Sequence, residues 1–274
     1  MENILEAGFL KDFCNIADNM YRLGWDERNA GNISYILSDD EINRYVDKNN
    51  VKSKFDLEYP IEYLDDYYFL VTGSGKYFKN VKNNVEDSAC VIRVTNKGKS
   101  IEILWGLING GRPTSELPTH LLLHEQRLKI DKNHRVVIHT HATNVLAMTL
   151  TEPLTDIAFT RALWKTSTEC IVVFPEGVGV LPWMVCGTYD IGLETAKVMK
   201  DYRVAIWALH GVFGTGDSLD EAFGLIETIE KTAQVYMIAS NKGIKQMISD
   251  DNLLKLAKFF KVSPKMDFLT DLKE

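Results

Sequence analysis

The sequence is short of cysteine, and none of its cysteines stands in a paired motif. Cys14, Cys90, Cys170 and Cys186 are scattered along the 274 residues, and no Cys-x-x-Cys occurs. This spacing suggests neither a thiolate zinc site nor a disulfide framework. Because reduced thiols are typical of cytoplasmic proteins, we expect a cytoplasmic location.

Long apolar runs and basic blocks are also missing. No run approaches the roughly 18 apolar residues of a membrane span, and the first six residues, MENILE, carry acids where a signal peptide carries bases. We therefore expect neither membrane insertion nor secretion. Lysine and arginine number 31 against 38 aspartates and glutamates, a net charge of -7. This balance argues against nucleic acid as a partner but leaves small anions open.

No internal repeat or low-complexity segment marks a domain boundary. Helix and strand patterns alternate, which predicts one α/β domain over residues 1–274 with a central sheet covered by helices. Residues 38–66 are acidic, rich in asparagine and poor in apolar residues, and are predicted to be a surface excursion. Strands are predicted at 33–37, 67–71, 90–95, 101–105, 136–141, 204–209 and within 166–175. Helices are predicted at 6–23, 142–148, 156–164, 187–199 and 218–240. A further helix is led by residues 113–118 and extends to 128.

Two histidines stand at the end of the apolar run Val-Val-Ile at 136–138. His139 and His141 are two residues apart, so both imidazoles would point to the same face of a strand, about 7 Å apart. A lone histidine at a strand end is more often structural. However, His210 ends a second apolar run, 204–209, and three histidines with positions left for substrate are typical of catalytic zinc. These three are the candidate metal ligands.

Two turn-forming stretches have compositions that suit an anion. Residues 29–32, Asn-Ala-Gly-Asn, offer amides and backbone N–H groups, although a plain turn is the alternative. Residues 72–76, Thr-Gly-Ser-Gly-Lys, follow a predicted strand and combine glycines, hydroxyls and a lysine, which suits phosphate. The second stretch lacks the full Walker spacing, so Gly-Ser-Gly alone is a weak signal.

A predicted helix carries Glu116 in its first turn. Thr114 and Ser115 are natural N-cap residues, and Glu116 is either a functional carboxylate or an acid that favours the helix dipole. His120 and His124 lie four residues apart on the same helix, a spacing that can bind metal. No His-Glu-x-x-His motif accompanies them, and we expect them to be structural or solvent-exposed.

Six stretches spread over the sequence resemble a known family. They are GWDERN at 24–29, VTGSGK at 71–76, PTSELP at 113–118, HTHATN at 139–144, TSTEC at 166–170 and HGVFG at 210–214. Together and in this order they resemble the class II, zinc-dependent sugar-phosphate aldolases. That superfamily includes fuculose aldolase, ribulose-phosphate epimerase and the adducin head, and the branch most similar to this sequence acts on rhamnulose 1-phosphate.

The resemblance implies a fold, an assembly and a role for each candidate residue. A mostly antiparallel sheet would lie between helix layers, and the protein would be a homotetramer with active sites at subunit interfaces. One Zn²⁺ per subunit would be held by His139, His141 and His210. Glu116 would be the acid/base, and Glu169 would reach across the interface, although the residues alone leave a capping role open for it. Phosphate would be bound by Asn29, Asn32, Ser74, Gly75, Thr114 and Ser115.

The activity that the resemblance implies is reversible cleavage of L-rhamnulose 1-phosphate to dihydroxyacetone phosphate and L-lactaldehyde. Cleavage leaves a carbanion beside a carbonyl, and a metal chelated by adjacent substrate oxygens stabilises that charge. Cleavage of L-fuculose 1-phosphate, 4-epimerisation of a pentulose 5-phosphate and a non-enzymatic role like that of the adducin head are the alternatives. The retained histidines and glutamates speak against the last, because a scaffold has no use for a metal site.

Overall fold

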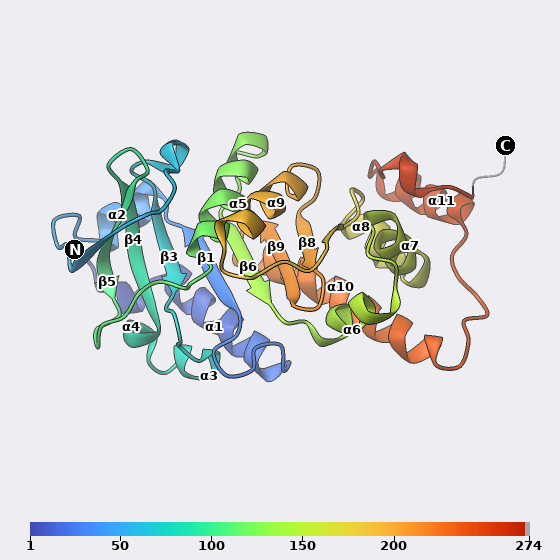
Figure 1. Ribbon diagram of the computed structural model, residues 1–274, viewed down its shortest axis with the longest axis horizontal. Coiled ribbons are helices and arrows are strands. Elements are labelled where there is room, and N and C mark those ends of the chain that lie inside the picture. The colour runs from blue at the N-terminus through green and yellow to red at the C-terminus, as the bar shows by residue number, and fades with distance from the viewer. Residues whose placement is uncertain (272–274) are drawn as a thin grey trace.

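A nine-stranded sheet crosses the computed structural model, which describes residues 1–271 (Figure 1). The strand order is β2-β5-β4-β3-β1-β6-β9-β8-β7, and every neighbouring pair is antiparallel except β7 with β8. The prediction of a mostly antiparallel central sheet is therefore confirmed. The strands are β1 Asn32–Ile36, β2 Ser53–Asp56, β3 Tyr68–Thr72, β4 Ala89–Thr95, β5 Ser100–Gly106, β6 Val136–Thr140, β7 Gly179–Leu181, β8 Val204–Trp207 and β9 Gly211–Gly216.

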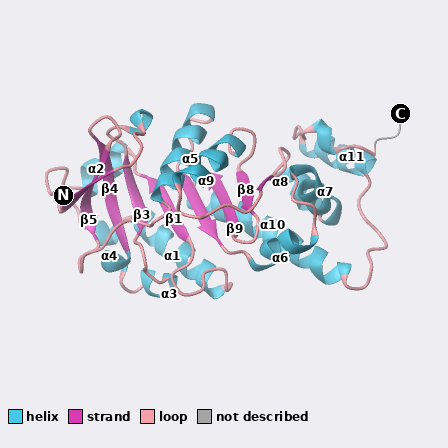
Figure 2. Cartoon of the chain, viewed as in Figure 1, coloured by secondary structure: helices cyan, strands magenta, loops and turns pink. Residues whose placement is uncertain are grey.

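Helices cover both faces of the sheet, as predicted (Figure 2). Helices α5 and α9 pack together on one face, while α1, α3 and α10 lie against the other. Within the described part, no helix is long and apolar enough to cross a membrane. The helices are α1 Gly8–Arg22, α2 Asp39–Tyr45, α3 Phe78–Val81, α4 Val85–Ser88, α5 Leu117–Ile130, α6 Thr143–Thr151, α7 Asp156–Thr166, α8 Thr168–Val173, α9 Tyr189–Val198, α10 Leu219–Ser240 and α11 Asp250–Phe260.

The alternation of side chains along β6 decides which face its histidine occupies. Val136 and Ile138 belong to the core between the sheet and the α1/α10 layer. Val137 belongs to the core on the opposite face, with residues of α5 and α9. Because side chains alternate along a strand, His139 lies on the face of Val137, under α5.

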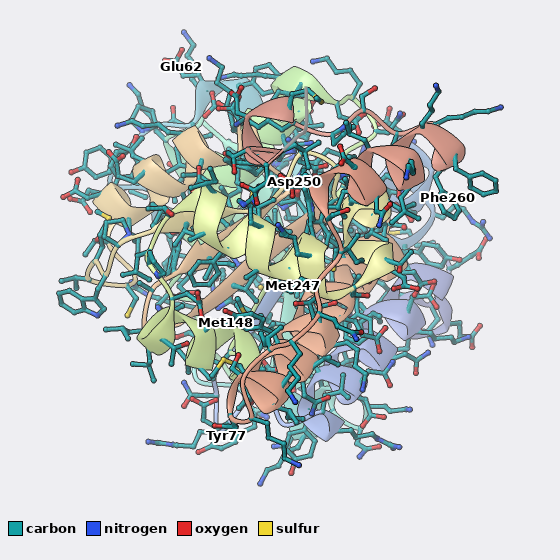
Figure 3. All side chains as sticks on the ribbon, turned by 90° about the vertical axis from the view of Figure 1, so that its right-hand side faces the viewer. Glu62, Tyr77, Met148, Met247, Asp250 and Phe260 are labelled. Carbon is teal, nitrogen blue, oxygen red and sulfur yellow. The ribbon has the colours of Figure 1, made fainter. Side chains whose placement is uncertain are left out.

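Helices α6, α7 and α8 pack around α10, and α11 lies against α7 and α8. Asp250, at the start of α11, is 1% exposed and accepts a hydrogen bond from Arg161 at 2.8 Å. Lys165 Nζ lies 3.2 Å from the other Asp250 oxygen. Figure 3 shows Asp250 over this part of the molecule and Phe260, at the far end of α11, pointing outward. These ion pairs hold α11 at its first turn.

The segment 38–66 contributes more to the fold than was predicted. It contains α2 and β2, and β2 pairs with β5 to form one edge of the sheet. Ile42, Val46, Ile61 and Leu64 are buried. The surface excursion is therefore anchored by a few apolar side chains whose spacing is too irregular to read from the sequence.

One local prediction was wrong, and one strand was missed. The strand predicted within 166–175 is the helix α8, because Cys170 and Ile171 are buried against α7, α10 and α11. The β-branched run there favours a strand, and tertiary packing overrides that preference. Strand β9 was not predicted, because its three glycines are typical of turns. Gly214 is needed where β9 meets α10, since a Cβ there would lie 2.7 Å from Ile226 Cγ1.

Candidate active site and metal centre

The candidate site forms at one edge of the sheet, where β1 begins and β3 and β6 end. In the antiparallel register, Asn32 of β1 lies opposite His139 of β6. On the other side of β1, the Ile33 N–H donates to Thr72 Oγ1 at 3.1 Å. Antiparallel neighbours bring the start of one strand beside the ends of the next two, so residues far apart in the sequence meet here.

The segment that leads into α5 is fixed over this edge by hydrogen bonds. The Thr114 N–H donates to the Thr72 carbonyl at 2.9 Å, and the Ser74 N–H donates to the Arg112 carbonyl at 2.8 Å. The Glu116 N–H in turn donates to Thr114 Oγ1 at 3.3 Å. The N-cap residue of α5, Glu116, is thus held at the sheet edge by a segment with little freedom to move.

The Glu116 carboxylate points at the histidines. It is 7% exposed, accepts a hydrogen bond from Asn32 Nδ2 at 2.9 Å and lies 3.5 Å from His139 Nε2. Although Glu116 is the N-cap residue, its side chain makes no capping hydrogen bond to α5. Its carboxylate is therefore available to a ligand at the histidines.

His139 presents one bare nitrogen to the site. Its Nδ1 lies 3.1 Å from the Val212 carbonyl, an acceptor, so Nδ1 carries the proton and Nε2 carries a lone pair. Burial lowers the pKa of His139 well below its ordinary value, and His141 and His210 add to this effect. The ring is neutral, and its Nε2 is buried with no hydrogen-bond partner among residues 1–271.

His141 is held in the same tautomer by a carboxylate. Its Nδ1 donates to Glu27 Oε1 at 2.9 Å, which leaves Nε2 free. Partial burial opposes the shift, yet the His141 hydrogen bond lowers the pKa of Glu27 below its ordinary value. A carboxylate behind a histidine fixes the ring and raises its basicity as a metal ligand.

The tight turn between β8 and β9 places His210. The His210 N–H donates to the Trp207 carbonyl at 3.2 Å, and the His210 ring centroid lies 5.1 Å from that of His139 and 5.0 Å from that of His141. Gly211 makes this approach possible, because a Cβ there would lie 2.5 Å from the Thr140 carbonyl oxygen and 3.0 Å from His139 Cε1.

The three histidines fit a divalent metal ion. One ring nitrogen from each of His139, His141 and His210 lies within 4.8 Å of the other two. The unpartnered Nε2 of His139 is the decisive observation, because a buried polar atom normally has a partner. Three histidines beside a carboxylate are typical of a catalytic rather than a closed structural site.

The residues predicted to bind phosphate lie on neighbouring segments, with one exception. Gly73 bridges to Pro113, which sets Ser74 and Gly75 beside Thr114 and Ser115. Ser74, Gly75 and Ser115 are exposed. Asn29 is exposed in the turn before β1. Asn32 differs, because its amide is already engaged by Glu116 and His120.

Glu169 is not brought to the histidines of its own subunit. It lies exposed on α8, where its Oε2 accepts a hydrogen bond from Ser167 Oγ at 2.6 Å. This hydrogen bond lowers the pKa of Glu169. Helix α8 packs against α7, α10 and α11 rather than against the sheet edge.

Sequence reasoning missed several residues around the site. Glu27 lies in a stretch that was noted only for its resemblance, and neither Ser34 nor His134 was singled out. His120 and His124 were expected to be structural or solvent-exposed, and their full burial on the sheet side of α5 rules out the second alternative. The leucines on both sides of these histidines were the available signal, because they leave α5 no wide polar face.

Comparisons with known proteins agree on one family. The model of the class II aldolase and adducin N-terminal domain matches residues 11–237. A rhamnulose-1-phosphate aldolase of Listeria innocua is 50% identical over 98% of this chain and 99% of its own length. The rhamnulose-1-phosphate aldolase of Enterococcus faecalis is 47% identical, over 98% of this chain and 97% of its own.

Solved structures show the same fold. A sugar-phosphate aldolase from Thermotoga maritima has a TM-score of 0.75 and 27% identity, over 86% of this chain and 97% of its own. An L-fuculose 1-phosphate aldolase has a TM-score of 0.62 and 20% identity, over 93% of this chain and 97% of its own. With the family model covering most of the sequence and relatives matching it end to end, this chain belongs to the class II aldolase and adducin N-terminal domain family.

Proposed function

We propose that this protein is an aldehyde-lyase that reversibly cleaves L-rhamnulose 1-phosphate to dihydroxyacetone phosphate and L-lactaldehyde. The observation that carries the reaction type is the Glu116 carboxylate 3.5 Å from the bare Nε2 of His139. The substrate comes from the relatives in Listeria and Enterococcus, which match the sequence from end to end. This choice of substrate also leads us to propose a role in rhamnose breakdown.

We further propose that His139, His141 and His210 hold one Zn²⁺. Three nitrogen donors with an open face suit zinc, and neutral imidazoles leave the ion its full charge. When bound, the ion supplies a Lewis acid for the substrate's adjacent carbonyl and hydroxyl oxygens. The histidines themselves orient that face toward Glu116.

Glu116 is the proposed acid/base at the carbon that loses its bond. Cleavage leaves a carbanion beside the carbonyl, and a proton must reach this carbon before dihydroxyacetone phosphate leaves. The Glu116 carboxylate carries that proton. Asn32 Nδ2 donates a hydrogen bond to Glu116 Oε2 at 2.9 Å and so fixes the orientation of the carboxylate. General acid/base help of this kind is worth about 10²–10⁴-fold.

The phosphate is bound away from the reacting bond. Ser74, Thr114 and Ser115 offer hydroxyls from adjacent segments, Gly75 and Ser115 offer backbone N–H groups, and Asn29 adds an exposed amide. Binding energy gained at the phosphate orients the sugar over the histidines. Asn32 lies between the phosphate-binding residues and the acid/base, since its amide already donates a hydrogen bond to Glu116.

The second acid is proposed to come from a neighbouring subunit. Glu169 is exposed and lies on α8, away from the histidines of its own subunit, so it acts only if another copy brings it there. We propose a homotetramer with sites at the interfaces, in which Glu169 moves the proton of the hydroxyl that becomes the aldehyde. The 62% exposed Trp183 and the 59% exposed Val185 support association.

The cytoplasm is the proposed location, and residues 1–274 are proposed to form one domain. Cys14, Cys90 and Cys170 are buried free thiols, and burial raises the pKa of Cys14 to about 11 and that of Cys170 to about 12. Unpaired thiols suit a reducing compartment. The continuous sheet from β2 to β7 supports a single domain.

The test is release of dihydroxyacetone phosphate from L-rhamnulose 1-phosphate and, in parallel, from L-fuculose 1-phosphate. Each assay is run with the metal-loaded protein and with chelator. Chelator-sensitive release that favours the rhamnulose phosphate supports the proposal. Preference for the fuculose phosphate overturns the substrate, and release from neither, with metal present, overturns the aldolase activity.

A further inference from the structure

Three histidines that the proposed reaction does not use lie together beside Asn32. His120 and His124 on α5 are 0% exposed, and His134, just before β6, is 3% exposed. With Ser34 of β1 they form what we call the histidine network. All six histidines of the sequence thus fall into two groups of three, one at the candidate metal centre and one between α5 and the sheet.

Hydrogen bonds join the network into one line that ends at Asn32. Ser34 Oγ lies 2.6 Å from His120 Nδ1 and 2.7 Å from His124 Nε2. His124 Nδ1 lies 2.8 Å from His134 Nε2. At the other end, His120 Nε2 is hydrogen-bonded to Asn32 Oδ1.

The direction of the first hydrogen bonds follows from the Glu116 carboxylate. A carboxylate only accepts, so Asn32 donates with Nδ2 and accepts with Oδ1. His120 Nε2 must then carry a proton. Burial lowers the pKa of His120 to about 3, so the ring is neutral and its Nδ1 is an acceptor. The Ser34 hydroxyl therefore donates to His120.

The hydrogen-bond directions at the far end of the line follow from Ser34. The Ser34 oxygen has given its proton to His120, so it accepts from His124 Nε2–H. Burial lowers the pKa of His124 well below its ordinary value and that of His134 to about 3. His124 Nδ1 is then a bare acceptor, and His134 Nε2–H donates to it. Every N–H and O–H in the line points toward Asn32 and, beyond it, Glu116.

We propose that the histidine network is a one-directional hydrogen-bond line that fixes the Asn32 amide and, through it, positions the Glu116 carboxylate. A neutral imidazole has a donor and an acceptor on one rigid ring, so it transmits direction along the line. If the core needed only volume, apolar side chains would fill it without the cost of burying polar rings. The role assigned to Glu116 rests on the proposed function. The tautomers assigned to His120, His124 and His134 do not depend on that function.

The first experiment reads the tautomers without using the reaction. In the metal-loaded protein labelled with ¹⁵N-histidine, ring-nitrogen chemical shifts report which nitrogen carries the proton. We expect His120, His124 and His134 to be neutral with the proton on Nε2, the opposite of the Nδ1–H form of His139 and His141. A charged ring or an Nδ1–H form at any of the three at neutral pH overturns the proposal. Single His→Gln variants assign the signals.

The second experiment separates positioning from packing. Glutamine places its side-chain nitrogen where His120 Nε2 lies, whereas asparagine is one carbon too short to reach Asn32 Oδ1. For His120→Asn we expect kcat to fall about 10–100-fold with KM within about twofold of the wild type. For His120→Gln we expect most of kcat to return. Equal losses in the two variants, or a loss in KM alone, overturn the positioning role.

A pair of buried serines gives the matched control. Ser34 and Ser100 both lie buried on strands of the sheet, and Ser100 Oγ donates to Asp56 outside the network. We expect Ser34→Ala to lower kcat about tenfold and Ser100→Ala to leave it unchanged. Identical kcat values for the two variants contradict the proposal. If the protein cleaved neither sugar phosphate, the tautomer experiment would still decide whether the line exists.

Discussion

The Glu116 carboxylate lies 3.5 Å from Nε2 of His139, a buried atom for which the described residues supply no hydrogen-bond partner. The carboxylate comes from the start of α5 and the imidazole from the end of β6. A free lone pair and an acid/base this close together are what proton transfer beside a metal ion requires. The predictions below test this arrangement.

Glu116→Gln should abolish most of the turnover and leave the metal in place. The amide oxygen of glutamine can still accept a hydrogen bond from Asn32, but the side chain can no longer take up and release a proton. We expect kcat to fall about 10²–10⁴-fold, measured with saturating L-rhamnulose 1-phosphate. Glu125→Gln on the same helix, which pairs with Lys129 at its surface, is the control and should behave like the wild type. Turnover of Glu116→Gln near the wild-type level would rule out the acid/base role.

Glu27→Ala should weaken metal binding without changing the fold. Its carboxylate fixes the His141 ring at 2.9 Å, and loss of such a partner typically lowers metal affinity about 10–100-fold. Because Glu27 is largely exposed, we expect the lower end of this range. Competition with a chromophoric chelator measures the affinity, and the exposed Glu6→Ala is the control. Unchanged affinity would show that His141 does not need this carboxylate.

Gly211→Ala should damage both stability and metal binding. The added Cβ would lie 2.5 Å from the Thr140 carbonyl and 3.0 Å from His139 Cε1, and backbone atoms cannot move aside cheaply. Urea unfolding should show a loss of about 1–3 kcal/mol. In Gly224→Ala the new Cβ meets nothing within 4 Å in the middle of α10, so a gain of about 0.5–1 kcal/mol is expected. Equal stability of the two variants would contradict the close packing at Gly211.

Acid should destabilise the metal-free protein through its buried histidines. Burial lowers the pKa of His134 to about 3, so between about pH 6 and pH 4 the unfolded chain binds a proton that the folded protein does not. Stability therefore rises with pH in this window, by about 1.4 kcal/mol per pH unit for one histidine, and is lost as the pH falls. Urea unfolding in chelator at fixed protein concentration should show a shallower pH dependence for His134→Gln. Identical slopes would mean that His134 is protonated in the folded state.

Mixed subunits should show whether Glu169 acts across an interface. Glu116→Gln and Glu169→Gln are each expected to be nearly inactive as pure proteins. If each site takes Glu116 from one subunit and Glu169 from its neighbour, random mixing in a ring of four gives about a quarter of the sites a full set. Refolding the variants together and measuring turnover tests this. No gain over the separate, inactive variants would rule out action across an interface, and full activity of Glu169→Gln alone would place Glu169 outside the reaction.

The candidate metal ligands were accessible from the sequence because their signals are local. An apolar run followed by His139 and His141 predicts two imidazoles on one face of a strand, and a similar run precedes His210. The structure brings these three side chains together, with ring centroids 5.0 to 5.4 Å apart. The helix predicted at 218–240 is local in the same way, because its apolar spacing lies in one segment, and the structure has it at Leu219–Ser240.

The histidine network and the helix that carries Glu169 could not be predicted from local sequence patterns. The leucines beside His120 and His124 hint at burial, but only the sheet beneath α5 brings these histidines to Ser34 and Asn32. The β-branched residues after Glu169 favour a strand, yet packing against α10 and α11 forms a helix. In both cases local preference is weaker than the burial that the rest of the molecule imposes.

The sequence by itself determined the order of most elements, the candidate metal ligands and the family. Only the tertiary structure decided that Asn32 lies opposite His139, and that the start of α5 places Glu116 between them. The physical reason is that strand register and helix docking depend on contacts between residues about a hundred positions apart. A slip of one residue in β1 would turn Asn32 and Ser34 to the other face of the sheet, and no local pattern in the sequence records that choice.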